Sequence, residues 1–289
     1  ALGGGVAVQD TLTVTALDGT TSTLVITING ASESGVVGTT LTGTAIANWL
    51  AGGNGNDTLL GLGGNDTLFG NGGDDILRGG IGADRMTGGT GNDSYYVDSK
   101  YDVVSEAVGE GTDTVLTTLV KYTLGNDVEN LTYLGALKFT GIGNALDNQI
   151  TGGTGADVLL GGAGNDNLNG AQGQDSLYGG AGSDLLTGGA GADFFIFKTS
   201  AESSDTITDF EHLNDRIDLH LIDSVATWAG NQAFNFIGDA DFGMKAGQLR
   251  FDVASDGVHV QGDTNGDGVA DFDLFLEGVT TLTSADFIL

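Results

Sequence analysis

The chain has 289 residues, of which 39 are acidic and 9 are basic, and its formal net charge of -30 disfavours binding to nucleic acid or an anionic membrane through a basic patch. It has no Cys, which excludes disulfides and thiolate metal sites, and no apolar run as long as a membrane-spanning helix. Gly accounts for 52 residues, yet 39% of the chain is hydrophobic, so a buried core is expected.

The first predicted element is a β-hairpin over Asp10–Gly30. This segment, DTLTVTALDGTTSTLVITING, alternates apolar and polar residues around Asp18-Gly19, a dipeptide typical of tight hairpin turns. It resembles the closing strands of Ig-like or cadherin-like repeats in large bacterial adhesins. A cap at the N-terminal end of the next element is the alternative interpretation.

A nine-residue repeat dominates the next part of the chain. Ten copies stand in register, five from Gly52 to Tyr96 and five from Gly152 to Ile196. In every copy the first and fourth positions are Gly, the sixth is Asp and the eighth is large and apolar. The second position is looser, because Leu62, Asn71 and Ala171 stand where the other copies have Gly. The positions shared by all copies are those that the structure constrains.

Each repeat divides into a six-residue turn rich in Gly, Asn and Asp and a three-residue strand whose middle side chain points inward. One such unit is half a coil, so two units complete a coil, and stacked coils give two parallel sheets back to back. We therefore predict an all-β fold, a parallel β-solenoid with the eighth-position residues between its sheets. These residues are Leu59, Leu68, Leu77, Met86, Tyr95, Leu159, Leu168, Leu177, Leu186 and Phe195.

The other segments depart from the repeat in different ways. Degenerate leaders, with Asn48 and Asn148 in the Asp position, precede the two blocks. Residues 97–142 have few Gly and many β-forming residues, and we interpret them as the same solenoid without metal turns. Beyond residue 199 the period is lost, and strands such as DRIDLHL and FDLFLEGV predict an antiparallel cap. The expected divisions are an N-terminal hairpin (1–40), a first repeat block (41–97), a spacer (98–142), a second repeat block (143–198) and a C-terminal cap (199–289).

The repeated aspartates indicate a metal. Equivalent Asp residues in adjacent coils would stack roughly 4.8 Å apart, where two bare carboxylates repel by about 1 kcal/mol even in water. A Ca²⁺ ion between adjacent coils removes this repulsion, because it accepts several oxygen ligands from carboxylates and turn carbonyls. Mg²⁺ demands a tighter octahedron, and Zn²⁺ favours the His or Cys that the turns lack. Ten copies in phase exclude the flexible linker that a single copy would suggest.

The pattern GGxGxDx-apolar-x resembles the hemolysin-type, or repeats-in-toxin (RTX), nonapeptide family. The resemblance implies a right-handed parallel β-roll with several Ca²⁺ ions in its turns, export as an unfolded chain through a one-step (type I) secretion channel, and folding on extracellular calcium. Sites beside Asn48 and Asn148 should be weaker or empty, because a charge is missing, and Asp102 in the spacer should influence calcium binding little. The family's ligands correspond to the carboxylates of Asp57, Asp66, Asp75, Asp84, Asp93, Asp157, Asp166, Asp175, Asp184 and Asp193, and to the carbonyls of Gly53, Gly55, Gly64, Gly73, Gly80, Gly82, Gly89, Gly91, Gly153, Gly155, Gly162, Gly164, Gly173, Gly180, Gly182, Gly189 and Gly191.

The C-terminal region carries a second resemblance. One stretch is similar to the C-terminal region of serralysin-type secreted proteases and alginate epimerase modules. It reads FFIFKTSAESSDTITDFEHLNDRIDLHLI, with Leu213 and His220 in place of the usual Gly and Ser. Further on, Asp263–Asp271 follows the spacing of an EF-hand loop but has Leu274 at position twelve, where Glu is required, so a hairpin turn is favoured. A terminal ion or surface turns equally explain Asp205, Asp209, Asp215 and Asp218.

No catalytic constellation stands out in the sequence. The three His residues are scattered, and neither HExxH nor GxSxG occurs. We therefore predict a non-catalytic calcium-binding module of a secreted or cell-surface bacterial protein, with its export signal in the C-terminal part. Two alternatives stay open: a module that binds extracellular polysaccharide, and the carrier tail of a secreted protease, lipase or epimerase whose catalytic domain lies upstream.

Overall fold

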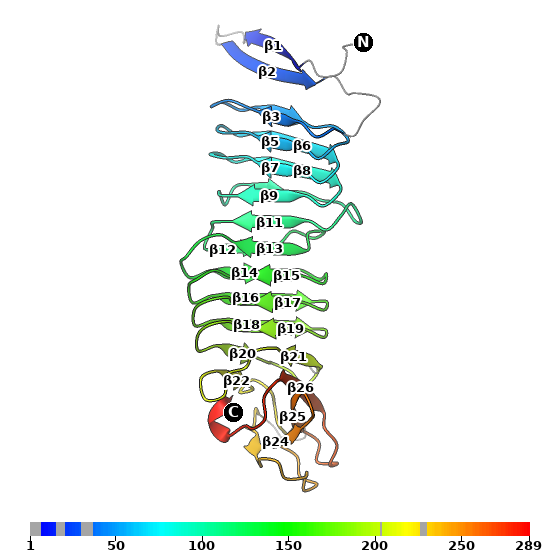
Figure 1. The fold of residues 1–289 in the computed structure, drawn as a ribbon, viewed down its shortest axis with the longest axis vertical. Coiled ribbons are helices and arrows are strands. Elements are labelled where there is room, and N and C mark those ends of the chain that lie inside the picture. The colour runs from blue at the N-terminus through cyan, green and yellow to red at the C-terminus, as the bar shows by residue number, and fades with distance from the viewer. Residues whose placement is uncertain (1–6, 16–20, 30–36, 203, 226–229) are drawn as a thin grey trace. The chain divides into compact units, whose positions relative to one another are not determined.

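The structure, a computed structural model, confirms the predicted all-β class (Figure 1). Its described residues contain strands and one short 3-10 helix but no α-helix, and none of their helices has the length and apolar character needed to cross a membrane. They divide into two compact units, Ala1–Leu119 with Gly125–Asn130, and Val120–Leu124 with Leu131–Leu289. The described residues are 7–15, 21–29, 37–202, 204–225 and 230–289.

The first unit holds two sheets, with strand orders β1-β2-β4-β6-β8-β10 and β3-β5-β7-β9-β11. Only β1 and β2 pair antiparallel, which confirms the predicted hairpin, although its Asp18-Gly19 turn lies outside the described residues. All other neighbours in these two sheets are parallel. The strands are β1 (Ala7–Thr15), β2 (Thr21–Asn29), β3 (Thr40–Thr42), β4 (Trp49–Ala51), β5 (Thr58–Leu60), β6 (Thr67–Gly72), β7 (Ile76–Arg78), β8 (Arg85–Thr90), β9 (Ser94–Val97), β10 (Val103–Val104) and β11 (Thr114–Thr117).

In the second unit, one sheet is parallel throughout, in the order β12-β14-β16-β18-β20-β22-β27, and another contains β15-β17-β19-β21-β26-β25-β24-β23. The remaining strands are β12 (Lys121–Thr123), β13 (Asn130–Tyr133), β14 (Thr140–Ile142), β15 (Gln149–Thr151), β16 (Val158–Ala163), β17 (Asn167–Asn169), β18 (Ser176–Ala181), β19 (Leu185–Thr187), β20 (Phe194–Ile196), β21 (Asp205–Ile207), β22 (Arg216–Asp218), β23 (Asn235–Phe236), β24 (Gln248–Val253), β25 (Gly257–Asp263), β26 (Phe272–Glu277) and β27 (Phe287–Ile288). The 3-10 helix η1 (Ser284–Asp286) precedes β27.

The strand register confirms that two repeats make one coil. Leu59 of β5 pairs with Leu77 of β7, and Leu68 of β6 pairs with Met86 of β8, each 18 residues further along the chain. All ten predicted inward residues are 0% exposed. Burial of one such Leu side chain contributes about 2 kcal/mol, so the apolar eighth position supplies the core that holds the Gly-rich turns in place.

The cap is antiparallel only in part. Strands β24, β25 and β26 pair antiparallel as predicted, and β26 then joins the solenoid by pairing parallel with β21. The DRIDLHL segment differs from its expected role, because β22 pairs parallel with β20 and sets Ile217 beside Phe195. The solenoid therefore continues past the last repeat wherever an apolar residue can extend its core.

Candidate metal centre

The ten repeat aspartates lie in the turns and are turned away from solvent, each no more than 2% exposed. The backbone N–H of each of the first three Asp in a block donates to Oδ1 of the Asp 18 residues later, at 2.6 Å from Asp57 to Asp75 and 2.8 Å from Asp166 to Asp184. Each block therefore holds two columns of carboxylates, one along each edge of its coils.

The second carboxylate oxygen distinguishes the first Asp of each block from the rest. Asp57 and Asp157 accept a hydrogen bond on Oδ2 from Gly53 and Gly153, both at 2.6 Å. In the other repeats Oδ2 is buried and has no hydrogen-bond partner. A buried acceptor without a partner costs about 1–3 kcal/mol, so these columns are stable only when each oxygen gains a partner. The residues concerned are Asp66, Asp75, Asp84, Asp93, Asp166, Asp175, Asp184 and Asp193.

Backbone carbonyls converge on these oxygens at the first repeat position. A Cβ atom on Gly70 would collide with Oδ2 of Asp75 and would lie 2.6 Å from the carbonyl oxygen of Gly88. Six repeats share this arrangement, with the carbonyl at 2.5 to 2.8 Å, which explains why the first position is always Gly. Carboxylate and carbonyl oxygens are the hard donors that Ca²⁺ prefers, and the repeats contain no His or Cys. The residues present therefore fit Ca²⁺.

The predicted carbonyl ligands lie at the second and fourth positions, whereas the carbonyls beside Oδ2 belong to first-position glycines such as Gly88, which the prediction did not include. Among the predicted second-position glycines, a Cβ on Gly80 would lie 2.5 Å from the Leu62 oxygen of the preceding coil, whereas a Cβ on Gly53 would meet nothing within 4 Å. Leu62, Asn71 and Ala171 have φ values of 75°, 78° and 74°, so they adopt the left-handed turn that Gly favours. Which carbonyls bind the ion stays a prediction.

Burial raises the pKa of the column carboxyl groups, and the N–H donors only partly offset it. The pKa of Asp75 rises from 3.8 to about 7, first through burial and further through Asp93 in the same column. In the second block, burial raises the pKa of Asp166 and Asp175 to about 7. Negative charge is therefore costly here without a cation, whereas the same low-dielectric surroundings strengthen attraction to Ca²⁺.

The columns extend beyond the repeats. The Asp84 N–H donates to Asp102 Oδ1 at 3.1 Å, so Asp102 takes the next place in a column, and its Oδ2 accepts from the Ser99 N–H at 3.0 Å. That Asp102 influences calcium binding little stays a prediction. Residues 97–105 in fact fit the nine-residue register, with Asp102 sixth and Val104 eighth. Further along, Asp113 accepts from Asp93 at a separation of 20 residues. In the second block Asp205 and Asp215 take the equivalent places at separations of 21 and 22 residues, which strict counting by nine overlooks.

The candidate terminal-ion set is therefore not one cluster. Asp205 and Asp215 belong to the two columns, and Asp209 accepts from the N–H groups of Gly188 and Gly189 at 2.9 and 2.7 Å. Asp218 instead contacts the ring of His220. At the other end of each block the Asn leaders continue the columns without charge, since the Asn48 N–H donates to Asp66 Oδ1 and the Asn148 N–H to Asp166 Oδ1.

The loop Asp263–Asp271 connects the antiparallel strands β25 and β26, as a hairpin turn should. Its carboxylates accept hydrogen bonds from the loop itself. Asp263 binds the N–H groups of Gly266 and Gly268 at 2.6 and 2.9 Å, and Asp271 binds that of Thr264 at 2.8 Å. These contacts support the hairpin interpretation over the EF-hand one.

The coils and their buried oxygen columns together define a calcium-binding parallel β-solenoid. The profile of the RTX calcium-binding nonapeptide repeat (4 copies) matches residues 42–77, 60–95, 69–103, 142–177 and 170–197. The two blocks therefore match RTX calcium-binding repeats, and their buried carboxylate columns indicate several Ca²⁺ ions.

Individual proteins match smaller parts. The chain is 43% identical over 68 residues to endo-1,3-1,4-beta-glycanase ExsH of Rhizobium meliloti (strain 1021), which is 24% of this chain and 14% of that protein. The AlgE6R3 subunit of the Azotobacter vinelandii mannuronan C5-epimerase matches with 30% identity, 51% of this chain, 80% of that chain and a TM-score of 0.38. The extracellular lipase LipA of Serratia marcescens matches with 17% identity, 89% of this chain, 40% of that chain and a TM-score of 0.36.

Proposed function

We propose that the chain is a non-catalytic, calcium-dependent folding module of a secreted or cell-surface bacterial protein, exported unfolded through a type I channel. The observation that carries this proposal is the set of eight buried Asp Oδ2 atoms without a hydrogen-bond partner within the repeat blocks. Each belongs to a carboxylate that is costly to bury in its ionised form unless a cation binds it.

This requirement couples folding to location. Ion sites that form only in the folded state contribute their binding free energy to folding. Extracellular modules use weak calcium sites, with dissociation constants of about 10⁻⁴–10⁻³ M, because calcium is plentiful outside the cell. In the cytosol such sites would stay empty, carboxylate repulsion would oppose folding, and the chain would remain threadable through a channel.

Deletion of residues 263–289 tests the export signal in a host that carries the cognate channel. The deletion also removes β26 and β27, which pair with β21 and β22, so a control must disturb the same packing and keep the C-terminus. Leu274→Asp serves, because Leu274 is fully buried in β26. We expect the deletion to abolish secretion into the medium and the control to be exported but less folded. Undiminished export of the truncated chain would contradict a terminal signal.

A second candidate is the carrier tail of a secreted carbohydrate-active enzyme. The stretch of 68 residues that is 43% identical to a Rhizobium meliloti glycanase supports it. The coding sequence upstream of Ala1 separates the candidates, since a catalytic domain there favours the carrier and repeated Ig-like segments favour an adhesin. A glycan array probed with the calcium-loaded chain tests whether the module itself binds polysaccharide.

A further inference from the structure

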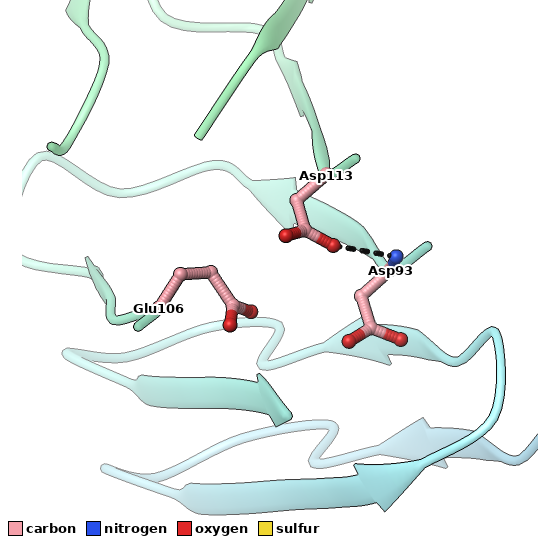
Figure 2. Close-up of side chains that lie close together, drawn as sticks. All are labelled: Asp93, Glu106 and Asp113. Atoms are coloured by element: carbon pink, nitrogen blue, oxygen red, sulfur yellow. Dashed lines mark hydrogen bonds between the residues drawn. The ribbon is translucent and has the colours of Figure 1, made fainter. Parts of the chain in front are cut away.

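Three carboxylates meet at the end of the first repeat block, in Asp93, Glu106 and Asp113 (Figure 2). One ligand oxygen from each lies within 4.8 Å of the others. Only Asp93 belongs to a nonapeptide repeat, and the family profile ends at residue 103, before the other two. The cluster is therefore distinct from the ordinary repeat turn.

The solenoid register explains how Glu106 reaches this place. In six repeats, the carbonyl of the Gly 18 residues later closes the space beside the first-position Gly. For Gly88 the residue 18 positions later is Glu106; the Asp93 carboxylate and the Tyr95 hydroxyl occupy the space beside Gly88, and the Glu106 side chain reaches the Gly88 N–H. The Gly88 N–H donates to Glu106 Oε1 at 3.2 Å and to the Tyr95 hydroxyl at 2.6 Å. Glu106 and Tyr95 thus accept from a Gly N–H that in other repeats donates to a strand carbonyl, as the Gly52 N–H does to Phe69.

Two of the converging groups have an oxygen without a partner. Asp93 is 1% exposed, and its Oδ2 is buried with no hydrogen bond. Oε2 of Glu106 is likewise buried and unpartnered. Asp113 Oδ1 accepts from the Asp93 N–H at 2.8 Å, which fixes the two chain segments against each other. One buried oxygen of Asp93 and one of Glu106 therefore accept no hydrogen bond, and both residues lie beside the carboxylate of Asp113.

We propose that Asp93, Glu106 and Asp113 form a further calcium site that closes the first block. Three carboxylates on one ion give it more negative charge than a turn that pairs two Asp with carbonyls. All three side chains offer hard oxygen donors, which suits Ca²⁺ and disfavours Zn²⁺. Two of them, Glu106 and Asp113, come from the segment 98–142, which the sequence predicted to lack metal turns. The site rests on calcium binding by the repeats but adds a ligand type that they lack.

The second block supplies an internal comparison. Its last coil also places an acid beside the first-position Gly, since Asp209 Oδ1 accepts from the Gly188 N–H at 2.9 Å. There the other oxygen, Oδ2, accepts from the Gly189 N–H at 2.7 Å, so both oxygens of Asp209 are satisfied by the backbone. Asp209 therefore ends its column through backbone hydrogen bonds alone, whereas Glu106 keeps one oxygen that can bind an ion.

The test compares Glu106→Gln with Asp209→Asn in the full chain. Glu106→Gln keeps the oxygen that accepts the Gly88 N–H, and Asp209→Asn keeps an acceptor for one of its two Gly N–H groups. Bound calcium is counted by native mass spectrometry across a calcium titration. We expect Glu106→Gln to bind one ion fewer than the unmodified chain, or to fill its last site at no less than tenfold higher calcium, and Asp209→Asn to match the unmodified chain. An unmodified chain that binds no calcium would refute the proposed function instead.

Terbium luminescence gives an independent measurement, because the Tyr95 hydroxyl borders the site and can sensitise a bound Tb³⁺ ion. Tyr95→Phe removes the sensitiser and defines the share of the emission that comes from this site. We expect Glu106→Gln to lose the Tb³⁺ emission that depends on Tyr95, and Asp209→Asn to keep it. Unchanged ion number, calcium dependence and emission in Glu106→Gln would overturn the proposal and leave Glu106 as a backbone cap.

Discussion

Acid should partly replace calcium in folding this chain. Burial raises the pKa of the column carboxyl groups above their value in the unfolded chain, so the calcium-free fold binds more protons than the unfolded chain between about pH 4 and 7. Stability linked to these groups is present below their unfolded pKa and is lost as the pH rises through their folded pKa. Lowering the pH from 8 to 5 in excess chelator should therefore stabilise the calcium-free fold.

The magnitude follows from the shifts. Burial and column neighbours raise the pKa of Asp75 from 3.8 to about 7, and those of Asp84 and Asp193 to about 6. One pKa unit corresponds to about 1.4 kcal/mol. Solvent screening reduces this, and we take about 1 kcal/mol for each shifted carboxyl group. Several such groups together approach the whole stability of an ordinary domain, about 5–15 kcal/mol.

Far-UV circular dichroism in excess chelator, recorded from pH 8 to pH 5, measures this effect. We expect the β signal to grow as the pH falls, and the calcium concentration needed for folding to fall over the same range, because protons supply part of the stabilisation that Ca²⁺ supplies at pH 8. A chelated chain that is equally unfolded at both pH values, or less folded at pH 5, would refute the reasoning.

Three further predictions concern single residues. Asp166→Ala should raise the midpoint of calcium-induced folding severalfold, whereas Asp102→Ala, whose two carboxylate oxygens both accept from the backbone, and Asp252→Ala, on a side chain that is 62% exposed, should shift it little; equal shifts in all three would mean that general acidity holds the ions. Leu62→Gly should raise the free energy of unfolding by about 1 kcal/mol in calcium, because Leu62 has a φ of 75°. Leu62→Ala keeps the strained Cβ and should show no such gain in the same denaturant titration, so a matching gain would exclude strain as the cause. Leu168→Ala should lower the free energy of unfolding of the calcium-bound form by about 2–5 kcal/mol, because it removes buried volume from the core. A decrease below about 1 kcal/mol in thermal unfolding would show that packing of the core does not hold the turns in place.

The sequence predicted the repeating part of the fold because its period is written in every copy. Position eight identified the buried side chains, such as Leu59 and Phe195, and position six identified the buried carboxylates. Both positions are the same in every copy, so comparing the ten copies within this chain was enough to find them.

The sequence failed where the register shifts. Asp113, Asp205 and Asp215 join the columns at separations of 20 to 22 residues, because extra residues lengthen a turn without displacing the strand that follows. Glu106 was missed for a different reason: its side chain, and not its backbone, fills the place of a carbonyl. Such substitutions depend on the three-dimensional path of the turn and leave no periodic signal.

The most direct test of the account is a calcium titration of the full chain at pH 8 and low ionic strength, followed by far-UV circular dichroism. The account predicts an unfolded spectrum in excess chelator and a cooperative gain of β signal at about 10⁻⁴–10⁻³ M calcium, fully reversed when chelator is added again. A chain that keeps its complete β signal in excess chelator would contradict the claim that calcium holds the buried carboxylate columns together.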